Sequence, residues 1–120
     1  MLSKEVLSEV LGVKVTKIWL DEAIPNMLYY ATDKSPVHRI NIYELAFKCK
    51  EWAIHKEFLI ESSLESVLDN GFAYAIVRVF FDGDMVFNNY DGKEFVGQWH
   101  TETEAIFKAT EWVYKNTRSK

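Results

Sequence analysis

TETEAIFKATEWVYK, residues 101–115, is the stretch from which the fold of this chain can be worked out. Thr101 and Glu104 fit the S/T-x-x-E capping box, in which each side chain satisfies a free backbone N–H at the start of a helix. The apolar side chains that follow recur on one helical face: Ala105, Ile106, Ala109, Trp112 and Val113. Two i,i+4 ion pairs are expected on the opposite face: Glu104 with Lys108, and Glu111 with Lys115. We therefore predict an amphipathic helix that lies on a core.

His100 and Glu102, at the start of this helix, could form an acid/base pair. Neither a nucleophile nor a third metal ligand nor a Gly-rich loop lies near them in the sequence. A capped helix end on a solvated surface is therefore the interpretation that we favour, and catalysis is the minor alternative. We expect that the chain is not an enzyme.

NIYELAFKCKEWAIHK, residues 41–56, repeats this design 60 positions earlier. The matched positions are Asn41 with Thr101, Glu44 with Glu104, Phe47 with Phe107, Lys48 with Lys108, Cys49 with Ala109, Glu51 with Glu111 and Trp52 with Trp112. Upstream, VTKIWLD at 15–21 matches IVRVFFD at 76–82. We predict two pseudo-repeated halves, 1–56 and 57–120, although chance similarity between two amphipathic helices is the alternative.

The same order of elements is expected in both halves: helix, strand, strand, with or without a third strand, then helix. In the first half these are a helix over 3–11, strands over 13–20 and 27–32, a short strand over 37–40 and the helix over 41–56. In the second half Ser62 and Glu65 suggest a capping box for a short helix that stops at Asn70–Gly71.

Three strands are then expected before the last helix, over 72–81, 85–90 and 94–99. Asp-Gly pairs at 82–83 and 91–92 supply the turns between them. Because a half of about 60 residues is marginal alone, we expect one domain, residues 1–120, with one core. The predicted fold class is α+β, in which the halves share antiparallel sheet packed against helices.

Charge and cysteine content limit the classes of partner. The formal charge of −4 opposes a general affinity for nucleic acid, since phosphate backbones are bound by Lys and Arg patches. Cys49 is the only cysteine, and the first 14 residues hold no apolar run long enough for a signal peptide or membrane span. We expect a cytoplasmic chain, without membrane contact, whose partner is a protein, including a second copy of itself.

Metal and cofactor sites are not expected. His38, His55 and His100 lie far apart, and no zinc-type spacing joins them to Cys49. DGDMVFNNYDG, residues 82–92, is acidic but lacks the order of an EF-hand calcium loop. Acidic tips do recur in both halves, as Asp21/Glu22 and Asp82/Asp84, so they form either a solvated rim or a shared acidic edge for a basic partner.

Lys17 and Arg78 occupy matching positions between apolar residues of the two longest predicted strands. Such side chains usually lay their stems over apolar surface and keep the charge in water. The alternative is that they bind an anionic ligand on the sheet face.

Four helix aromatics are candidate interface residues: Tyr43, Phe47, Phe107 and Tyr114. Phe47 and Phe107 fall at equivalent positions beside the predicted core stripes, and the two tyrosines lie near the same edges. Either these rings pack the two helices together within the chain, or they form an exposed apolar patch for dimerisation or partner binding.

The second half resembles double-stranded RNA-binding domains in its predicted topology only. Those domains place basic residues at the start of the last helix, where this chain has TETE, residues 101–104, so we do not expect it to bind double-stranded RNA. NIYELAFKCKEWA and TETEAIFKATEWVYKN resemble small phage and prophage proteins, including those grouped as the phage ABA-sandwich domain. This second resemblance covers about residues 41–116. It implies a compact helix–sheet fold and a mobile-element origin, and it carries over no catalytic residue.

Two functional hypotheses follow. The first is a non-enzymatic interaction protein that binds a host or phage protein through its sheet edge or helix aromatics, for example as an inhibitor of a host enzyme. The alternative is a small-ligand binder or weak enzyme that uses the sheet face around Lys17 and Arg78.

Overall fold

The computed structural model describes residues 2–67, 72–88 and 101–118 of the chain. It has an α+β fold, as the sequence predicts. The elements in chain order are α1 (Lys4–Leu11), β1 (Val15–Leu20), β2 (Met27–Thr32), β3 (His38–Asn41), α2 (Ile42–His55), β4 (Phe58–Val67), β5 (Phe72–Phe81), β6 (Asp84–Asn88) and α3 (Thr101–Arg118).

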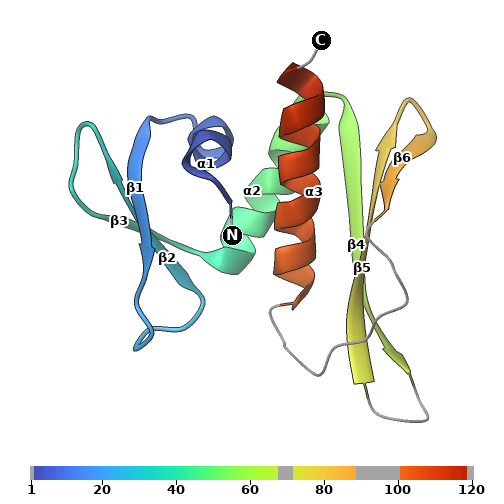
Figure 1. Ribbon diagram of the computed structural model, residues 1–120, viewed down its shortest axis with the longest axis horizontal. Coiled ribbons are helices and arrows are strands. Elements are labelled where there is room, and N and C mark those ends of the chain that lie inside the picture. Colours follow the sequence, from blue (N-terminus) through green and yellow to red (C-terminus); the bar gives the residue numbers. More distant parts are fainter. Residues whose placement is uncertain (1, 68–71, 89–100, 119–120) are drawn as a thin grey trace.

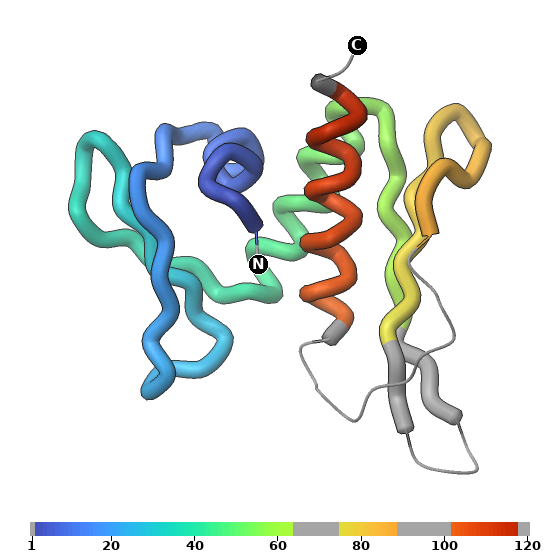
Figure 2. The backbone as a smooth tube through the Cα atoms, viewed as in Figure 1, coloured from blue at the N-terminus to red at the C-terminus, as the bar shows by residue number. Residues whose placement is uncertain are grey.

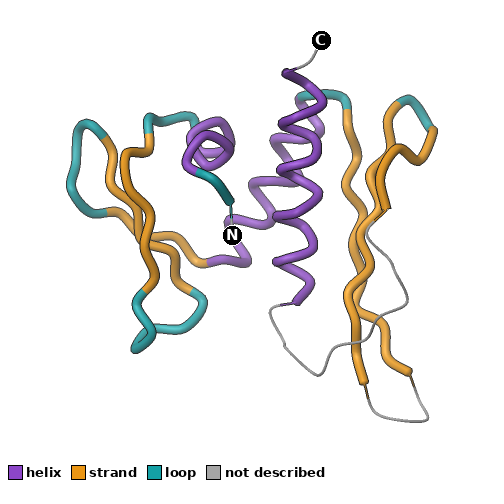
Figure 3. The backbone as a smooth tube through the Cα atoms, in the orientation of Figure 1, coloured by secondary structure: helices purple, strands orange, loops and turns teal. Residues whose placement is uncertain are grey.

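The described strands form two separate antiparallel sheets. Sheet 1 has the order β1-β2-β3 and sheet 2 the order β4-β5-β6. The helices lie between the sheets, so that the molecule has three layers (Figures 1 and 3). The antiparallel strands packed on helices agree with the prediction, but among the described residues each half builds a sheet of its own and no ladder joins the two.

Each sheet has its own hydrophobic core against the helical layer. The sheet 1 core joins α1 and sheet 1 to Ile42, Leu45, Ala46 and Cys49 of α2 and to Ile106 and Phe107 of α3. The sheet 2 core joins sheet 2 to Trp52 and Ala53 of α2 and to Ala105, Ala109 and Val113 of α3. Both long helices therefore bury side chains on two sides, which is why they occupy the middle layer.

Local signals account for the first half. The Ser3 hydroxyl accepts a hydrogen bond from the Val6 N–H at the start of α1 (3.2 Å), and Gly12 ends that helix with a φ of 70°. The Asn41 side chain caps α2 by accepting from the Tyr43 N–H at 2.8 Å. The helices and strands predicted for this half are confirmed, with small shifts at their ends.

The second half begins differently from the prediction. The helix expected from Ser62 and Glu65 is wrong, because β4 runs through these residues and pairs with β5 over ten positions without a bulge. The Ser62 hydroxyl does not cap a helix; it donates to the Glu102 carboxylate of α3 at 2.7 Å. The second half therefore opens with a strand where the first opens with a helix.

The later elements of this half agree with the prediction where the structure describes them. The strands predicted over 72–81 and 85–90 are β5 and β6, and the helix predicted from Thr101 is α3; the turn predicted at 82–83 is confirmed as well. Asp82 and Gly83 join β5 to β6 with φ values of 53° and 84°, and two positive φ values are what a type I′ hairpin turn requires. The stop at 70–71, the turn at 91–92, the strand at 94–99 and His100 fall outside the described residues.

Candidate protein-interaction surface

The two candidate anion-binding residues lie on different sheets. Lys17 is exposed on the outer face of sheet 1, where its Nζ lies 5.3 Å from the centroid of the Trp19 ring. Trp19 in turn stacks on Tyr29 of β2, with ring centroids 6.0 Å apart. Arg78 lies on the outer face of sheet 2, between Val77 and Val79, which are buried in the sheet 2 core. Because the helical layer separates the two sheets, the structure does not bring Lys17 and Arg78 together (Figure 1).

The four candidate interface aromatics divide into two pairs. Phe107 is 3% exposed in the sheet 1 core, and Tyr114 packs against both cores. Phe47 is 63% exposed and Tyr43 42% exposed. The first alternative from the sequence, packing within the chain, therefore holds for the α3 pair, and exposure holds for the α2 pair.

Ile54 extends the exposed α2 pair into a line along the helix. It is 58% exposed and follows Phe47 by seven residues. At 3.6 residues per turn, Tyr43, Phe47 and Ile54 lie within about 40° of one another around the helix axis. We call these three residues the apolar stripe. Ile54 is not among the interface residues predicted from the sequence, although its spacing from Phe47, on the side away from Leu45 and Cys49, is a usable signal.

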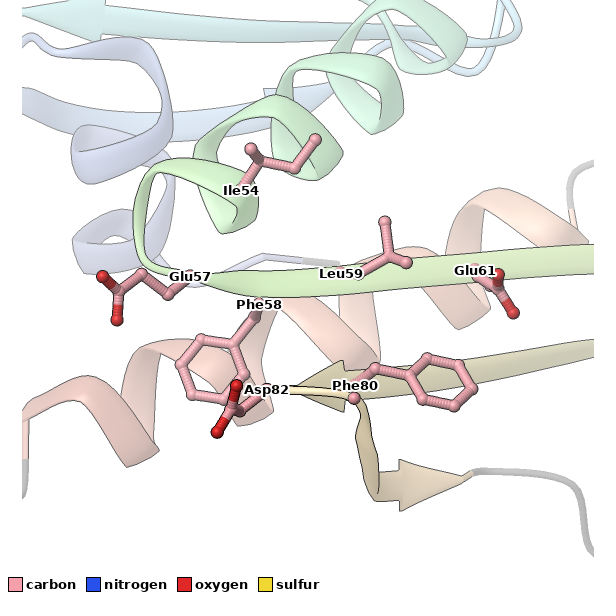
Figure 4. Close-up of a pocket in the computed structure, with 8 residues that line it drawn as sticks. Ile54, Glu57, Phe58, Leu59, Glu61, Phe80 and Asp82 are labelled. Carbon is pink, nitrogen blue, oxygen red and sulfur yellow. The ribbon is translucent and has the colours of Figure 1, made fainter.

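The apolar stripe ends in a groove between the end of α2 and the outer face of sheet 2 (Figure 4). The groove has a volume of about 530 Å³ and is lined by Ile54, Glu57, Phe58, Leu59, Glu61, Phe80, Asp82 and Gly83. Leu59 and Phe80 are directly opposite each other in the β4–β5 ladder. Figure 4 shows Leu59 between the side chains of Glu57 and Glu61 along the chain. We call this feature the acidic groove.

Two left-handed backbone positions shape the rim of the acidic groove. Glu57 has a φ of 71°, and its N–H donates to the Ile54 carbonyl at 2.9 Å, so that α2 turns directly into β4. Asp82 has a φ of 53° in the β5–β6 turn. Non-glycine residues rarely adopt this conformation, and glutamate does so less readily than aspartate or asparagine. The end of α2 thus accepts local strain in placing the Glu57 carboxylate at the rim.

The other acidic tip lies elsewhere. Asp21 and Glu22 line a second cavity of about 580 Å³, between the β1–β2 turn and the start of α3, whose lining also includes Phe107. The β1–β2 turn is at the bottom of Figure 2 and the β5–β6 turn at the top, on opposite sides of the helical layer. The two acidic tips therefore do not form one shared edge.

The remaining candidate residues, two histidines and a cysteine, lie in surroundings typical of packing or of a solvated surface. His38 stacks on Tyr30 with ring centroids 5.1 Å apart, and His55 is exposed at the end of α2. Cys49 is buried, and this burial raises the pKa of its thiol to about 12, against the opposing effect of a hydrogen bond with Thr110. Across 2–67, 72–88 and 101–118, no three His, Cys, Asp or Glu side chains are grouped so as to hold a metal ion.

Comparisons with known proteins identify no relative. The chain matches no family model, no curated protein and no solved structure. Within the described part of the chain, no helix combines the length and the apolar content needed to cross a membrane. The exposed surface of α2 and sheet 2 is therefore the main guide to function.

Proposed function

We propose that this chain is a non-enzymatic cytoplasmic protein that acts by binding another protein through the apolar stripe of α2. The observation that carries the proposal is the exposure of Phe47, 63% of whose surface is open to solvent in the middle of a helix whose opposite face is buried. Large aromatic side chains contribute much of the affinity at protein interfaces. A line of three exposed apolar residues on one helix face is the form such an interface takes.

The surroundings of the stripe support a protein partner. From Tyr43 to Ile54 the stripe extends about 16 Å along the helix axis at 1.5 Å per residue, which suits a packed helix or strand of a partner. Lys50 and Glu51 flank it as a polar rim. The resemblance to small phage and prophage proteins makes a host enzyme the partner class to test first, with inhibition as the expected effect.

The test is capture of the partner from a nuclease-treated cell extract, using the tagged chain and mass spectrometry. We expect one near-stoichiometric protein with the wild type and its loss with the double variant Phe47→Ser/Ile54→Ser. Lys48→Ser, on the same helix outside the stripe, is the matched control and should capture as the wild type does. Thermal unfolding checks that every variant is folded. Equal capture by the double variant and the wild type would refute the proposal.

A second copy of the chain is one form of this partner. Size-exclusion chromatography with light scattering separates the two cases, because self-association depends on the concentration of the pure protein. If the wild type is dimeric, the double variant should be monomeric. If the wild type is monomeric, a different protein occupies the stripe.

The alternative function is binding of a small anionic ligand on the outer face of sheet 1. It is favoured by one observation, the position of the Lys17 ammonium over Trp19, which itself stacks on Tyr29. Thermal stabilisation by such a ligand should be lost in Lys17→Ala and kept in Arg78→Ala, since Arg78 lies on the other sheet. If both substitutions lower only the stability of the fold, this alternative fails.

A further inference from the structure

The floor of the acidic groove is apolar and open. Ile54 and Leu59 are exposed hydrophobic side chains at its edge, and Phe80 lies opposite Leu59 in the neighbouring strand. Apolar surface of this kind is stabilised when a partner removes it from water, by about 25 cal/mol for each Å² covered. The groove, with a volume of about 530 Å³, has room for one or two apolar side chains.

The rim of the groove carries charge of one sign. Its lining holds three carboxylates, those of Glu57, Glu61 and Asp82, and no Lys or Arg. Arg78 does not line the groove, but it is the cross-strand neighbour of Glu61 and lines, with Lys50, an adjacent cavity that Glu61 also borders. The carboxylates of Glu57 and Asp82 lie outside that cavity and carry the negative charge at the other end of the groove. Carboxylates grouped beside an apolar surface concentrate a negative potential there and attract cations.

The groove is continuous with the apolar stripe, because Ile54 belongs to both. A partner seated on α2 would therefore extend into the groove. The segment of the partner that enters the groove meets an apolar floor flanked by carboxylates. In an extended segment whose leucine-like anchors enter the groove, the intervening side chains point away from its floor. Lys and Arg are long enough at these positions to reach back to the carboxylates of the rim, so the complementary segment alternates the two kinds of residue.

We infer that the acidic groove is the docking site for a cationic, apolar-anchored segment of the partner protein. The inference rests on the proposed function and specifies the chemistry of its partner. Arginine suits the rim better than lysine, because its planar guanidinium donates two parallel hydrogen bonds to a carboxylate. Affinity at this site depends on salt, as expected for rim-exposed charge pairs.

The test uses a capped pentapeptide that alternates arginine and leucine, titrated into the ¹⁵N-labelled full chain. Two control peptides replace its arginines by glutamate or its leucines by serine. We expect amide shifts at Leu59 and Phe80 with the arginine–leucine peptide only, and weaker binding at higher salt. The variant Glu57→Gln/Asp82→Asn keeps the shape of the rim and should bind roughly three- to ten-fold more weakly. Glu9→Gln, which changes an exposed carboxylate of α1 away from the groove, should bind as the wild type does.

Several results would overturn the inference. These are binding weaker than about 1 mM by the arginine–leucine peptide, equal binding by the glutamate peptide, shifts located away from the groove, or unchanged affinity in Glu57→Gln/Asp82→Asn. The capture experiment distinguishes failure of this inference from failure of the proposed function. A partner captured through Phe47 but insensitive to Glu57→Gln/Asp82→Asn overturns only this inference, whereas capture that survives Phe47→Ser/Ile54→Ser overturns the proposed function.

Discussion

The carboxylate of Glu111 in α3 accepts hydrogen bonds from both the backbone N–H and the hydroxyl of Ser3, 108 positions earlier in the chain. The two donor–acceptor distances are 3.2 Å and 3.4 Å. The Ser3 hydroxyl also caps α1 by accepting from the Val6 N–H. One carboxylate thus holds the cap of α1 against the middle of α3, where the N-terminal residues run beside that helix (Figure 2).

Replacing Glu111 should therefore loosen the N-terminal helix. We expect Glu111→Ala to lower the free energy of unfolding by about 1–2 kcal/mol, because it removes two hydrogen bonds and the support of a helix cap. Glu9→Ala, an exposed carboxylate of α1, should change it by less than about 0.5 kcal/mol. Urea unfolding followed by circular dichroism measures both. Equal effects of the two substitutions would show that the Ser3 contact contributes nothing.

The stacking of Phe87 on Trp112 should control the attachment of β6. Their ring centroids are 5.5 Å apart with nearly parallel planes, and Phe58 meets the edge of the same tryptophan at 6.0 Å. We expect Phe87→Ala to cost about 2 kcal/mol of unfolding free energy, from lost apolar burial and the ring contact. Met85→Ala, on an exposed side chain of the same strand, is the control and should cost far less. Similar losses for both would mean that the stacked pair has no special role.

Glu57→Gly should make the protein more stable. Glycine adopts a φ of 71° without the steric cost that a Cβ imposes, and it is the preferred residue directly after a helix. The expected gain is about 1 kcal/mol in the free energy of unfolding. Glu57→Ala keeps the Cβ and should bring no such gain. If glycine stabilises while weakening the binding of the arginine–leucine peptide, the native glutamate is retained at a cost in stability, and a loss of stability with glycine would exclude this account.

The buried thiol of Cys49 predicts a loss of stability at alkaline pH. Burial raises its pKa from 9.0 to about 12, so the fold favours the neutral thiol. Below pH 9 the stabilisation is complete, and it falls as the pH rises toward 12, because the unfolded chain ionises first. In that window the free energy of unfolding should fall by about 1.4 kcal/mol per pH unit more steeply than in Cys49→Ala. Chemical denaturation at several pH values measures both slopes, and parallel slopes would contradict the assignment.

The extent to which the fold follows from the sequence depends on how local each signal is. Ser3, Gly12 and Asn41 cap helices through neighbours within a few residues, so the first half could be predicted element by element. Ser62 has the same local pattern as a capping residue, but its hydroxyl bonds Glu102, 40 residues away, and ten-residue pairing with β5 decides the strand. Such a contact leaves no mark in the adjacent sequence.

Contacts between residues distant in sequence also limit how much of the interaction surface can be predicted. Phe47 and Phe107 occupy equivalent positions in two similar helices, yet one is exposed and the other buried, because only α3 presents this position to the sheet 1 core. Helical periodicity could identify the stripe on α2, including Ile54. The acidic groove could not be found in this way, since Ile54 and Phe80 meet only through the pairing of β4 with β5.

The three-layer arrangement has a consequence for how the molecule opens. The same two helices, α2 and α3, bury side chains in both cores, and α1 completes the cover of sheet 1, while the outer face of each sheet meets solvent along much of its length. An outer sheet can detach while the helices keep the other core, but the helices cannot separate without uncovering both. Amide hydrogens in the middle turns of α2 and α3 should therefore exchange with deuterium only through complete unfolding, and those of β1 and β6 should exchange first.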